Sequence, residues 1–326
     1  MTKIAIIGAG MSGLSIATML QDYAEVTVFE KSRGVSGRMS TRFADPYFFD
    51  HGAQYFTIRT NAFRELIQPL IDCGVVERWT PRYAKLCREK ILEHKFWLDD
   101  EPRYVGVPNM NSVIKYLAKN ITVKINTNIN ALKRKKKWQL LDESGNLYKN
   151  FDWVISSIPA PQAAALLPNK FKYFTSIKAV KMRPCFALML GFSSSFPTKF
   201  DAAHIENADI NWVAVNSQKP GRNLFTILAH STENYAEKNI NQKHEKILQH
   251  LCSETSKIFE YDVNSAEHKT VHSWLFANNS FRKNLPTFLD KNLKLAACGD
   301  WSQGGRVEGA FTSAHNLFTA MKKEFQ

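Results

Sequence analysis

Short apolar runs alternate with glycine-rich or polar segments at the start of the chain. Residues 3–7 form an apolar run typical of a buried parallel strand, and residues 26–29 form a second one. Between them, residues 14–20 combine apolar and small residues and read as a helix that packs closely. This order of strand, helix and strand predicts a βαβ unit and a parallel sheet.

The later hydrophobic pattern predicts a second sheet. Residues 62–73 have apolar positions at helical spacing, and Gly74 is placed to end that helix. Three strand-like runs between residues 121 and 158 predict a meander that returns to the first sheet. Strand-like runs then dominate residues 165–290. We expect an α/β protein with a discontinuous nucleotide-binding domain (1–60, 104–164 and 290–326) and a mixed-sheet substrate domain (61–103 and 165–289).

A glycine-rich turn follows the first apolar run at once. It consists of Gly8, Ala9, Gly10, Met11, Ser12 and Gly13. Glu30 ends the second apolar run, where its carboxylate can accept hydrogen bonds from a ribose. Gly10 would let a pyrophosphate approach the backbone, and the helix N-terminus would attract the phosphates. We expect a dinucleotide site; the alternative is a glycine turn in an ordinary βαβ unit.

Four further motifs carry a family resemblance. Gly37 and Arg38 follow the ribose acid, and residues 50–56 read DHGAQYF. Near the other end, residues 298–301 read CGDW and residues 306–311 read RVEGAF. Together with the glycine turn, these motifs resemble those of renalase and its bacterial relatives, a branch of the flavin amine oxidase superfamily.

The resemblance implies a Rossmann-type FAD-binding domain of glutathione-reductase-like, p-hydroxybenzoate-hydroxylase-like topology. The last helix would point its N-terminus at the flavin. We expect the FAD to be non-covalent, because Cys298 lies inside a strand, ahead of the glycine-aspartate turn. The residues expected to contact FAD are Gly8, Ala9, Gly10, Met11, Ser12, Gly13, Glu30, Lys31, Gly37, Arg38, Met39, Gln54, Tyr55, Ile129, Gly299, Asp300, Val307, Gly309 and Ala310.

Three residues of the second sheet are candidates for the reaction itself. His230 follows a buried-looking run, and the resemblance places a histidine there facing the flavin; a hydrogen-bonded structural histidine is the alternative. Trp274 could wall the ring cavity or pack in the core. Asn216 and Arg222, from the distinctive loop 216–222, could contact phosphates or cap a turn.

Charge and cysteine content narrow the possible partners. The formal net charge is +13, but the densest basic run, residues 133–137, has the pattern of a solvated hairpin turn. No nucleic-acid-binding motif stands out, and the longest apolar runs are too short to span a membrane. The five cysteines form no CxxC pair, and the first strand leaves no room for a signal peptide. We expect a cytoplasmic protein without a metal site.

Two classes of function remain open. As an oxidase, the protein would take a hydride onto flavin N5 and pass the electrons to O2, giving H2O2. Resemblance to renalase makes the donor a 2- or 6-dihydro isomer of NAD(P)H, oxidised to NAD(P)+, whereas resemblance to the wider superfamily makes it a small amine. The other class is a non-catalytic FAD-binding sensor or assembly protein. The sequence leaves the oligomeric state open.

Overall fold

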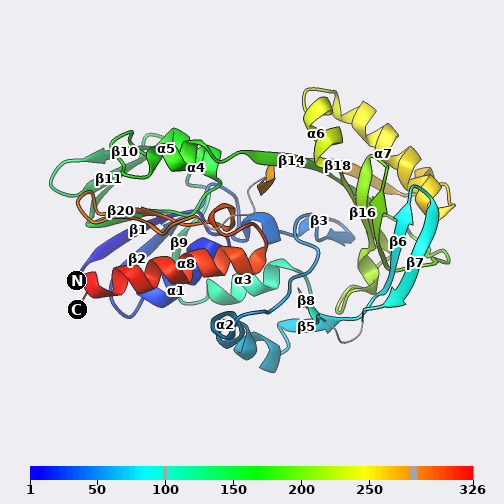
Figure 1. Ribbon diagram of the computed structural model, residues 1–326, viewed down its shortest axis with the longest axis horizontal. Helices are drawn as coiled ribbons and strands as arrows, with labels where there is room; N and C mark the ends of the chain where they lie inside the picture. Colours follow the sequence, from blue (N-terminus) through cyan, green and yellow to red (C-terminus); the bar gives the residue numbers. More distant parts are fainter. Residues whose placement is uncertain (98–100, 280–284, 326) are drawn as a thin grey trace.

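The chain folds into two lobes, each organised around a β-sheet (Figure 1). The computed structural model describes residues 1–97, 101–279 and 285–325. Both chain termini lie on the lobe that contains the N-terminal strand, which places the first and last segments of the chain side by side. None of the helices within these ranges is both long enough and apolar enough to span a lipid bilayer.

The first lobe contains a six-stranded sheet in the order β19-β20-β13-β1-β2-β9. All neighbours pair in parallel except β19 and β20. The bounds are β1 Lys3–Ile7, β2 Glu25–Phe29, β9 Thr122–Lys124, β13 Trp153–Ser156, β19 Phe288–Asp290 and β20 Leu295–Ala297. The βαβ unit predicted from the first apolar runs is confirmed, with α1 at Met11–Leu20 between β1 and β2.

Helices cover one face of this sheet and a small sheet covers the other. Ile4 and Ile6 of β1 belong to one core with α1 and the last helix, α8 (Val307–Met321). Ala5 and Ile7 point the opposite way, as strand geometry requires, into a second core. That core includes the meander β10 (Ile129–Arg134), β11 (Trp138–Asp142) and β12 (Leu147–Phe151), together with α4 (Ala160–Leu166) and α5 (Phe174–Lys178). Both faces of β1 are buried, which explains its continuous apolar run.

The second lobe is built on a seven-stranded sheet in the order β18-β14-β17-β16-β15-β6-β7. Its pairings are antiparallel except that between β15 and β6. The bounds are β6 Arg82–Cys87, β7 Lys90–Phe96, β14 Met182–Gly191, β15 Ala202–Glu206, β16 Ile210–Val215, β17 Thr226–Ser231 and β18 His268–Asn279. Helices α6 (Glu233–Asn239) and α7 (His244–Phe259) cover its outer face (Figure 1), leaving the inner face toward the first lobe.

Several elements connect the lobes: the hairpin β3 (Arg42–Ala44) and β4 (Tyr47–Phe49), the pair β5 (Val76–Trp79) and β8 (Arg103–Gly106), and helices α2 (Asn61–Asp72) and α3 (Asn111–Leu117). The structure differs from the expected domain boundary at α2. Phe63 of α2 packs on Phe311 of α8 at 5.2 Å between ring centroids, and Glu308 accepts hydrogen bonds from the backbone N–H groups of Arg59 and Thr60. Within residues 61–103, β6 and β7 are the strands that join the second sheet.

A substitution at Gly13 tests how tightly α1 packs on the end of β1. A Cβ at Gly13 would lie 2.0 Å from the backbone oxygen of Gly8, whereas a Cβ at Gly34 would meet nothing within 4 Å. We expect Gly13→Ala to lower the free energy of unfolding by about 1–3 kcal/mol because overpacking displaces the backbone, although alanine favours a helix. Gly34→Ala is the control. Urea unfolding measures both, and equal stabilities would contradict this packing.

Candidate active site

The two glycine segments predicted to hold a dinucleotide face each other. A Cβ on Gly37 would lie 3.3 Å from Gly10 Cα, and the backbone N–H of Ser36 donates to the Ala9 oxygen at 3.0 Å. A Cβ on Gly10 would meet only Gly37 Cα, at 3.9 Å, so the backbone there borders open space. This space lies at the N-terminus of α1, where no side chain caps the free N–H groups. We call this space, bordered by Gly10 and Gly37 at the N-terminus of α1, the cradle; its free N–H groups suit a pyrophosphate.

The predicted ribose acid lies at the end of β2 beside the cradle. The buried Glu30 carboxylate accepts hydrogen bonds from the backbone N–H groups of Ala9 and Ser32, both at 2.8 Å. The backbone N–H of Thr127 donates to the Glu30 carbonyl at 2.8 Å, which brings the segment leading to Ile129 alongside. The positions expected to contact the ribose and the adenine are therefore neighbours in space.

Arg38 and Asp300, each expected to contact the cofactor, bind each other. Arg38 Nη1 donates to Asp300 Oδ2 at 2.9 Å, and Nη2 donates to Oδ1. Nη1 also donates to the Ala277 carbonyl of β18 at 3.0 Å. This bidentate pair joins the second glycine segment to the last one and ties both to the second sheet.

The last helix begins beside the same cradle. Arg306, with a φ of 72°, is the residue before the first turn of α8, and Ser12 Oγ of α1 donates to the Ala310 carbonyl at 2.7 Å. Gly299 permits close packing, since a Cβ there would lie 2.2 Å from Trp301 Nε1. The predicted C-terminal contacts, including Val307 and Gly309, therefore lie next to the N-terminal glycine turn.

His230 and Trp274 meet at one backbone atom of the DHGAQ loop, residues 50–54. Trp274 Nε1 donates to the His51 carbonyl at 2.8 Å, and His230 Nε2 lies 3.1 Å from the same oxygen. The His51 ring stacks on Trp274 with centroids 5.0 Å apart. Both side chains thus hold the loop against the second sheet. Burial lowers the pKa of His230 to about 4, so its ring is neutral and Nε2 carries the proton that the carbonyl accepts.

The sequence interpretation missed Lys219, which lies at the centre of a buried network. Its ammonium group donates to Gln54 Oε1 and to Asn216 Oδ1, each at 3.1 Å, and lies 4.0 Å from Asp50 Oδ2. Arg222 Nη2 donates to the same Asp50 oxygen. The side chains of Asp50 and Lys219 are 0% exposed.

Asn216 and Arg222 therefore belong to this network. Asn216 Nδ2 also donates to the Phe48 carbonyl at 3.2 Å, so both ends of its amide have partners inside the protein. Thr41 Oγ1 completes the network by donating to Asp50 Oδ1 at 2.8 Å. The loop 216–222 was recognisable as distinctive, but nothing local to the sequence indicated that its lysine is buried.

The buried network carries more positive than negative charge while Lys219 is protonated. Burial alone would raise the pKa of Asp50, but Lys219, Arg222 and the Met110 N–H hold it below its usual value. Burial lowers the pKa of Lys219 to about 7, although the nearby Asp50 carboxylate acts to raise it. One carboxylate faces two cationic side chains, so protonating Lys219 leaves an excess positive charge beside Gln54.

An aromatic cluster adjoins the DHGAQ loop through Tyr55, the residue that follows the loop. It consists of Tyr55, Trp79, Tyr83, Trp97 and Trp212. Tyr83 stacks on Trp97 at 4.4 Å between centroids, and the Arg103 guanidinium carbon lies 3.8 Å from the Trp97 ring centre. One face of the Trp97 ring is therefore already in a cation–π contact with the Arg103 side chain.

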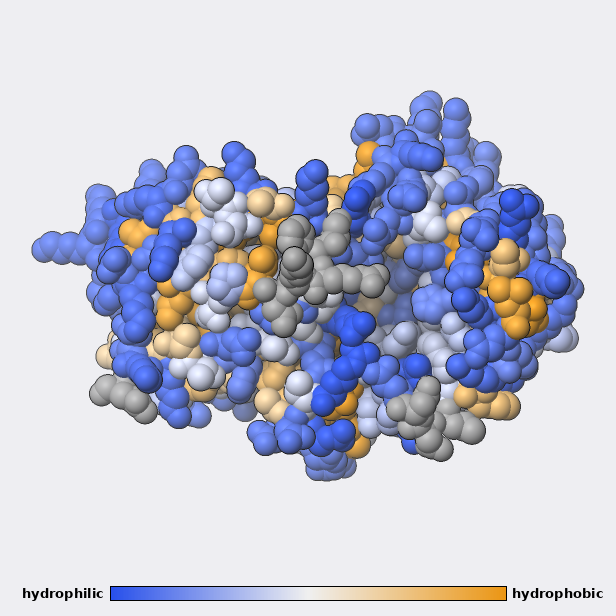
Figure 2. All heavy atoms as spheres, in the orientation of Figure 1, coloured by the Kyte–Doolittle hydropathy of each residue, from blue (hydrophilic) through white to orange (hydrophobic). Residues whose placement is uncertain are grey.

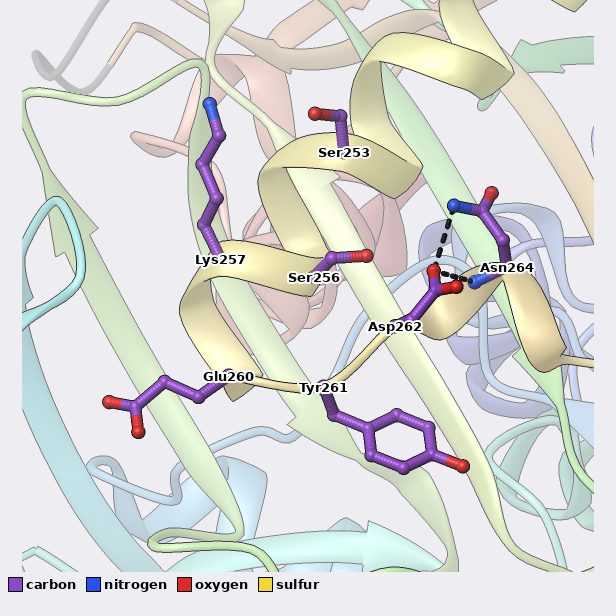
Figure 3. A pocket seen from close by; sticks show the side chains of 7 residues that line it. All are labelled: Ser253, Ser256, Lys257, Glu260, Tyr261, Asp262 and Asn264. Atoms are coloured by element: carbon purple, nitrogen blue, oxygen red, sulfur yellow. Dashed lines mark hydrogen bonds between the residues drawn. The ribbon is translucent and has the colours of Figure 1, made fainter.

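The aromatic cluster shares no residue with the pocket drawn in Figure 3. Figure 2 shows the surface hollowed between the two lobes, with hydrophilic residues along the recess. The pocket of Figure 3 lies at the C-terminal end of α7, where Asp262 accepts hydrogen bonds from the backbone and side-chain nitrogens of Asn264. It is on the outer helices of the second lobe and contains none of the predicted site residues.

Family models match both parts of the chain. Residues 6–70 match the NAD(P)-binding Rossmann-like domain, and residues 77–316 match the flavin containing amine oxidoreductase family. The chain belongs to the flavin containing amine oxidoreductase family. It is an FAD-dependent oxidoreductase.

Solved structures and curated sequences are similar to this chain over different lengths. A protein from a species of Exiguobacterium, assigned as a protoporphyrinogen oxidase, aligns with 99% of each chain at a TM-score of 0.78 and 11% identity. Putrescine oxidase bound to putrescine aligns with 100% of this chain and 99% of its own at a TM-score of 0.69 and 11% identity. These two share the fold. A 4,4'-diapophytoene desaturase from Staphylococcus aureus is 47% identical over 51 residues, which are 15% of this chain and 10% of the desaturase.

Substitution at Gly10 tests the placement of the phosphates. The space around a Cβ at Gly10 is open in the protein itself, so we expect Gly10→Val to fold but to lose FAD, because the side chain fills the pyrophosphate's approach. The flavin absorbance of the purified protein measures the loss, and circular dichroism measures folding. Normal flavin content in the folded variant would place the phosphates elsewhere.

The buried Lys219 predicts a pH dependence of stability. The folded protein releases the Lys219 proton at a pKa of about 7, whereas an unfolded lysine holds it to 10.5. Between these values the unfolded chain binds more protons, so this group makes stability rise with pH by up to about 1.4 kcal/mol per pH unit. The rise begins near pH 7 and ends near pH 10.5.

Lys219→Met should remove that rise, while the control Lys170→Met, at an exposed lysine, should keep it. Urea unfolding of the FAD-loaded proteins at several pH values from roughly 6 to 9.5 measures the slopes. Parallel wild-type and Lys219→Met curves would show that Lys219 stays protonated in the folded protein.

Proposed function

We propose that the protein is a renalase-like oxidase of dihydronicotinamide dinucleotides. The reaction converts a 2- or 6-dihydro isomer of NAD(P)H, O2 and a proton into NAD(P)+ and H2O2. When bound, FAD supplies the redox chemistry, accepting a hydride at N5 and delivering two electrons to O2. The chain's own residues bind and orient the donor. We place the enzyme in the cytoplasm.

The charge around the DHGAQ loop is the main observation that supports a dihydronicotinamide dinucleotide as the donor. Lys219 and Arg222 lie beside Asp50, so the network at this loop holds more cations than carboxylates while Lys219 is protonated. The whole chain adds a formal net charge of +13. A positive field attracts a donor that carries a pyrophosphate and repels a protonated amine.

The aromatic cluster supports the same choice. An amine substrate held by cation–π contacts needs an open aromatic face. In this protein the Trp97 ring is stacked by Tyr83 and approached by the Arg103 guanidinium. A flavin amine oxidase acting on a small amine is therefore the second candidate. A non-catalytic FAD-binding protein is the third.

His230 would position the donor through its free ring nitrogen. Since Nε2 donates to the His51 carbonyl, Nδ1 of the neutral ring is an acceptor. We propose that it accepts a hydrogen bond from the donor's carboxamide and so sets which ring carbon faces N5. Trp274 donates to the same His51 carbonyl and would thereby fix the position of the DHGAQ loop relative to the second sheet.

Anaerobic stopped-flow mixing tests the donor. We expect the flavin band to bleach rapidly with mixed NADH isomers made by chemical reduction of NAD+, and slowly with ordinary NADH or with a panel of amines. Re-admitting oxygen should then release H2O2. Rapid bleaching by an amine and none by the isomers would overturn the proposal in favour of an amine oxidase.

His230→Ala should slow flavin reduction by about 10-fold or more and change reoxidation little, because only reduction needs an oriented donor. His250→Ala is the control, since His250 lies on α7, away from the DHGAQ loop, and pairs there with Asp209. The two rate constants are measured separately by stopped flow. Equal slowing of both steps would show that His230 only holds the fold.

A further inference from the structure

Trp212 is the cross-strand neighbour of His230 on the inner face of the second sheet. The two residues are register partners in the antiparallel pair of β16 and β17. The next pair along these strands, Val213 and Ala229, belongs to the core that α6 and α7 cover. Because side chains alternate along a strand, Trp212 and His230 both point the other way, toward the first lobe. Directly opposite residues have Cβ atoms about 4.5–5.5 Å apart, so the two rings start from neighbouring points.

The indole N–H of Trp212 is a buried donor without a partner. Trp212 is 5% exposed, and its Nε1 atom makes no hydrogen bond with any residue that the structure describes. The ring itself is held by Tyr55 at 5.8 Å, His204 at 4.8 Å and Trp97 at 6.0 Å between centroids. A buried donor that bonds nothing costs stability, which a ligand that accepts from it would restore.

Other tryptophans near the DHGAQ loop have already used their donors. Trp79 of the aromatic cluster donates through Nε1 to the Gln218 carbonyl at 3.2 Å, and Trp274 donates to the His51 carbonyl. Of the tryptophans in the described ranges, Trp212 is the one with a buried indole N–H that lacks a partner. Its N–H is therefore an exception that packing alone does not explain.

His230 presents an acceptor beside this donor. Its Nε2 donates to the His51 carbonyl at 3.1 Å, so Nδ1 of the neutral ring carries a lone pair. Within the part of the chain that the structure describes, nothing donates to Nδ1, and the side chain is half-buried. One donor and one acceptor thus lie on adjacent strands of the same sheet face.

We propose that Trp212 Nε1 and His230 Nδ1 together bind a primary carboxamide. The amide oxygen accepts from the indole N–H and the amide NH2 group donates to the imidazole nitrogen, so one planar group satisfies both atoms. A carboxylate offers acceptors only and would set an oxygen against the lone pair of Nδ1. This assignment takes its substrate from the proposed function, in which the carboxamide is that of the dihydronicotinamide ring. Trp212 is then a specificity-determining residue.

Adenine is the other source of this pair in a dinucleotide. Its amino group donates and the adjacent ring nitrogen accepts, which matches the same two protein atoms. The experiments below separate the two sources.

Calorimetric titration of the FAD-loaded protein compares NAD+ with its nicotinic-acid analogue, in which a carboxylate replaces the carboxamide. We expect the wild type to bind NAD+ about 10-fold or more tightly, because only the amide can donate to Nδ1. Trp212→Phe should weaken both ligands by about 5-fold or more and keep the preference, because both carry an oxygen that accepts from the lost N–H. His230→Ala should remove the preference.

Trp79→Phe is the matched control, because the same substitution removes an N–H that already bonds the Gln218 carbonyl. It should leave both affinities unchanged. Equal affinity of Trp212→Phe and the wild type for NAD+, or no saturable binding of NAD+ by the wild type, would overturn the proposal.

Indole N–H signals in NMR spectra of isotope-labelled protein give a readout that needs no variant. NAD+ should shift the Trp212 signal and leave that of Trp138 unmoved, since Trp138 donates to the Leu293 carbonyl in the other core of the first lobe. An unmoved Trp212 signal at saturating NAD+ would overturn the site.

Fragments of the dinucleotide separate the two sources. Nicotinamide mononucleotide has the carboxamide and lacks adenine, whereas ADP-ribose has adenine and lacks the carboxamide. Trp212→Phe should weaken the mononucleotide and leave ADP-ribose unchanged; the reverse would assign the pair to adenine and overturn the carboxamide. If the NADH isomers fail to reduce the flavin while NAD+ and its analogue bind as stated, the proposed function falls and the carboxamide site stands.

Discussion

The buried carboxylate of Asp50 is the constraint on which the joined lobes depend. It accepts hydrogen bonds from Thr41, from the Met110 N–H and from Arg222, and it lies 4.0 Å from Lys219. These partners come from three separate parts of the chain. Leaving such a buried charge without a partner costs about 3–5 kcal/mol, so the three segments must dock together for the protein to fold.

The chemistry depends on the same docking. Lys219 bonds Gln54 of the DHGAQ loop, while His230 and Trp274 hold that loop through the His51 carbonyl. In the proposed reaction, hydride transfer requires reacting atoms about 3–3.5 Å apart, so a small shift between the two sheets would separate donor and acceptor. Under the proposed function, the network that joins the lobes would thus also set the geometry of the reaction.

The nucleotide-binding half could be predicted almost completely. The glycine turn, both flanking strands and the acid at the end of β2 are adjacent in the chain, and their conformations follow from local geometry. Tertiary packing decided other matters. Helix α2 packs in the first core, because Phe63 contacts Phe311 there. Arg38 pairs with Asp300, although the two residues are 262 positions apart.

The sequence by itself determined the two sheets, the dinucleotide cradle and the family resemblance, because periodicity and glycine conformation are properties of short segments. Only the tertiary structure showed that Lys219 is buried and that Asn216 and Arg222 belong to an internal network. Gln54 and Lys219 are 165 positions apart, so no local pattern could pair them. Whether a charged side chain is solvated or buried is decided by which distant segments pack around it, and that information is absent from any one segment.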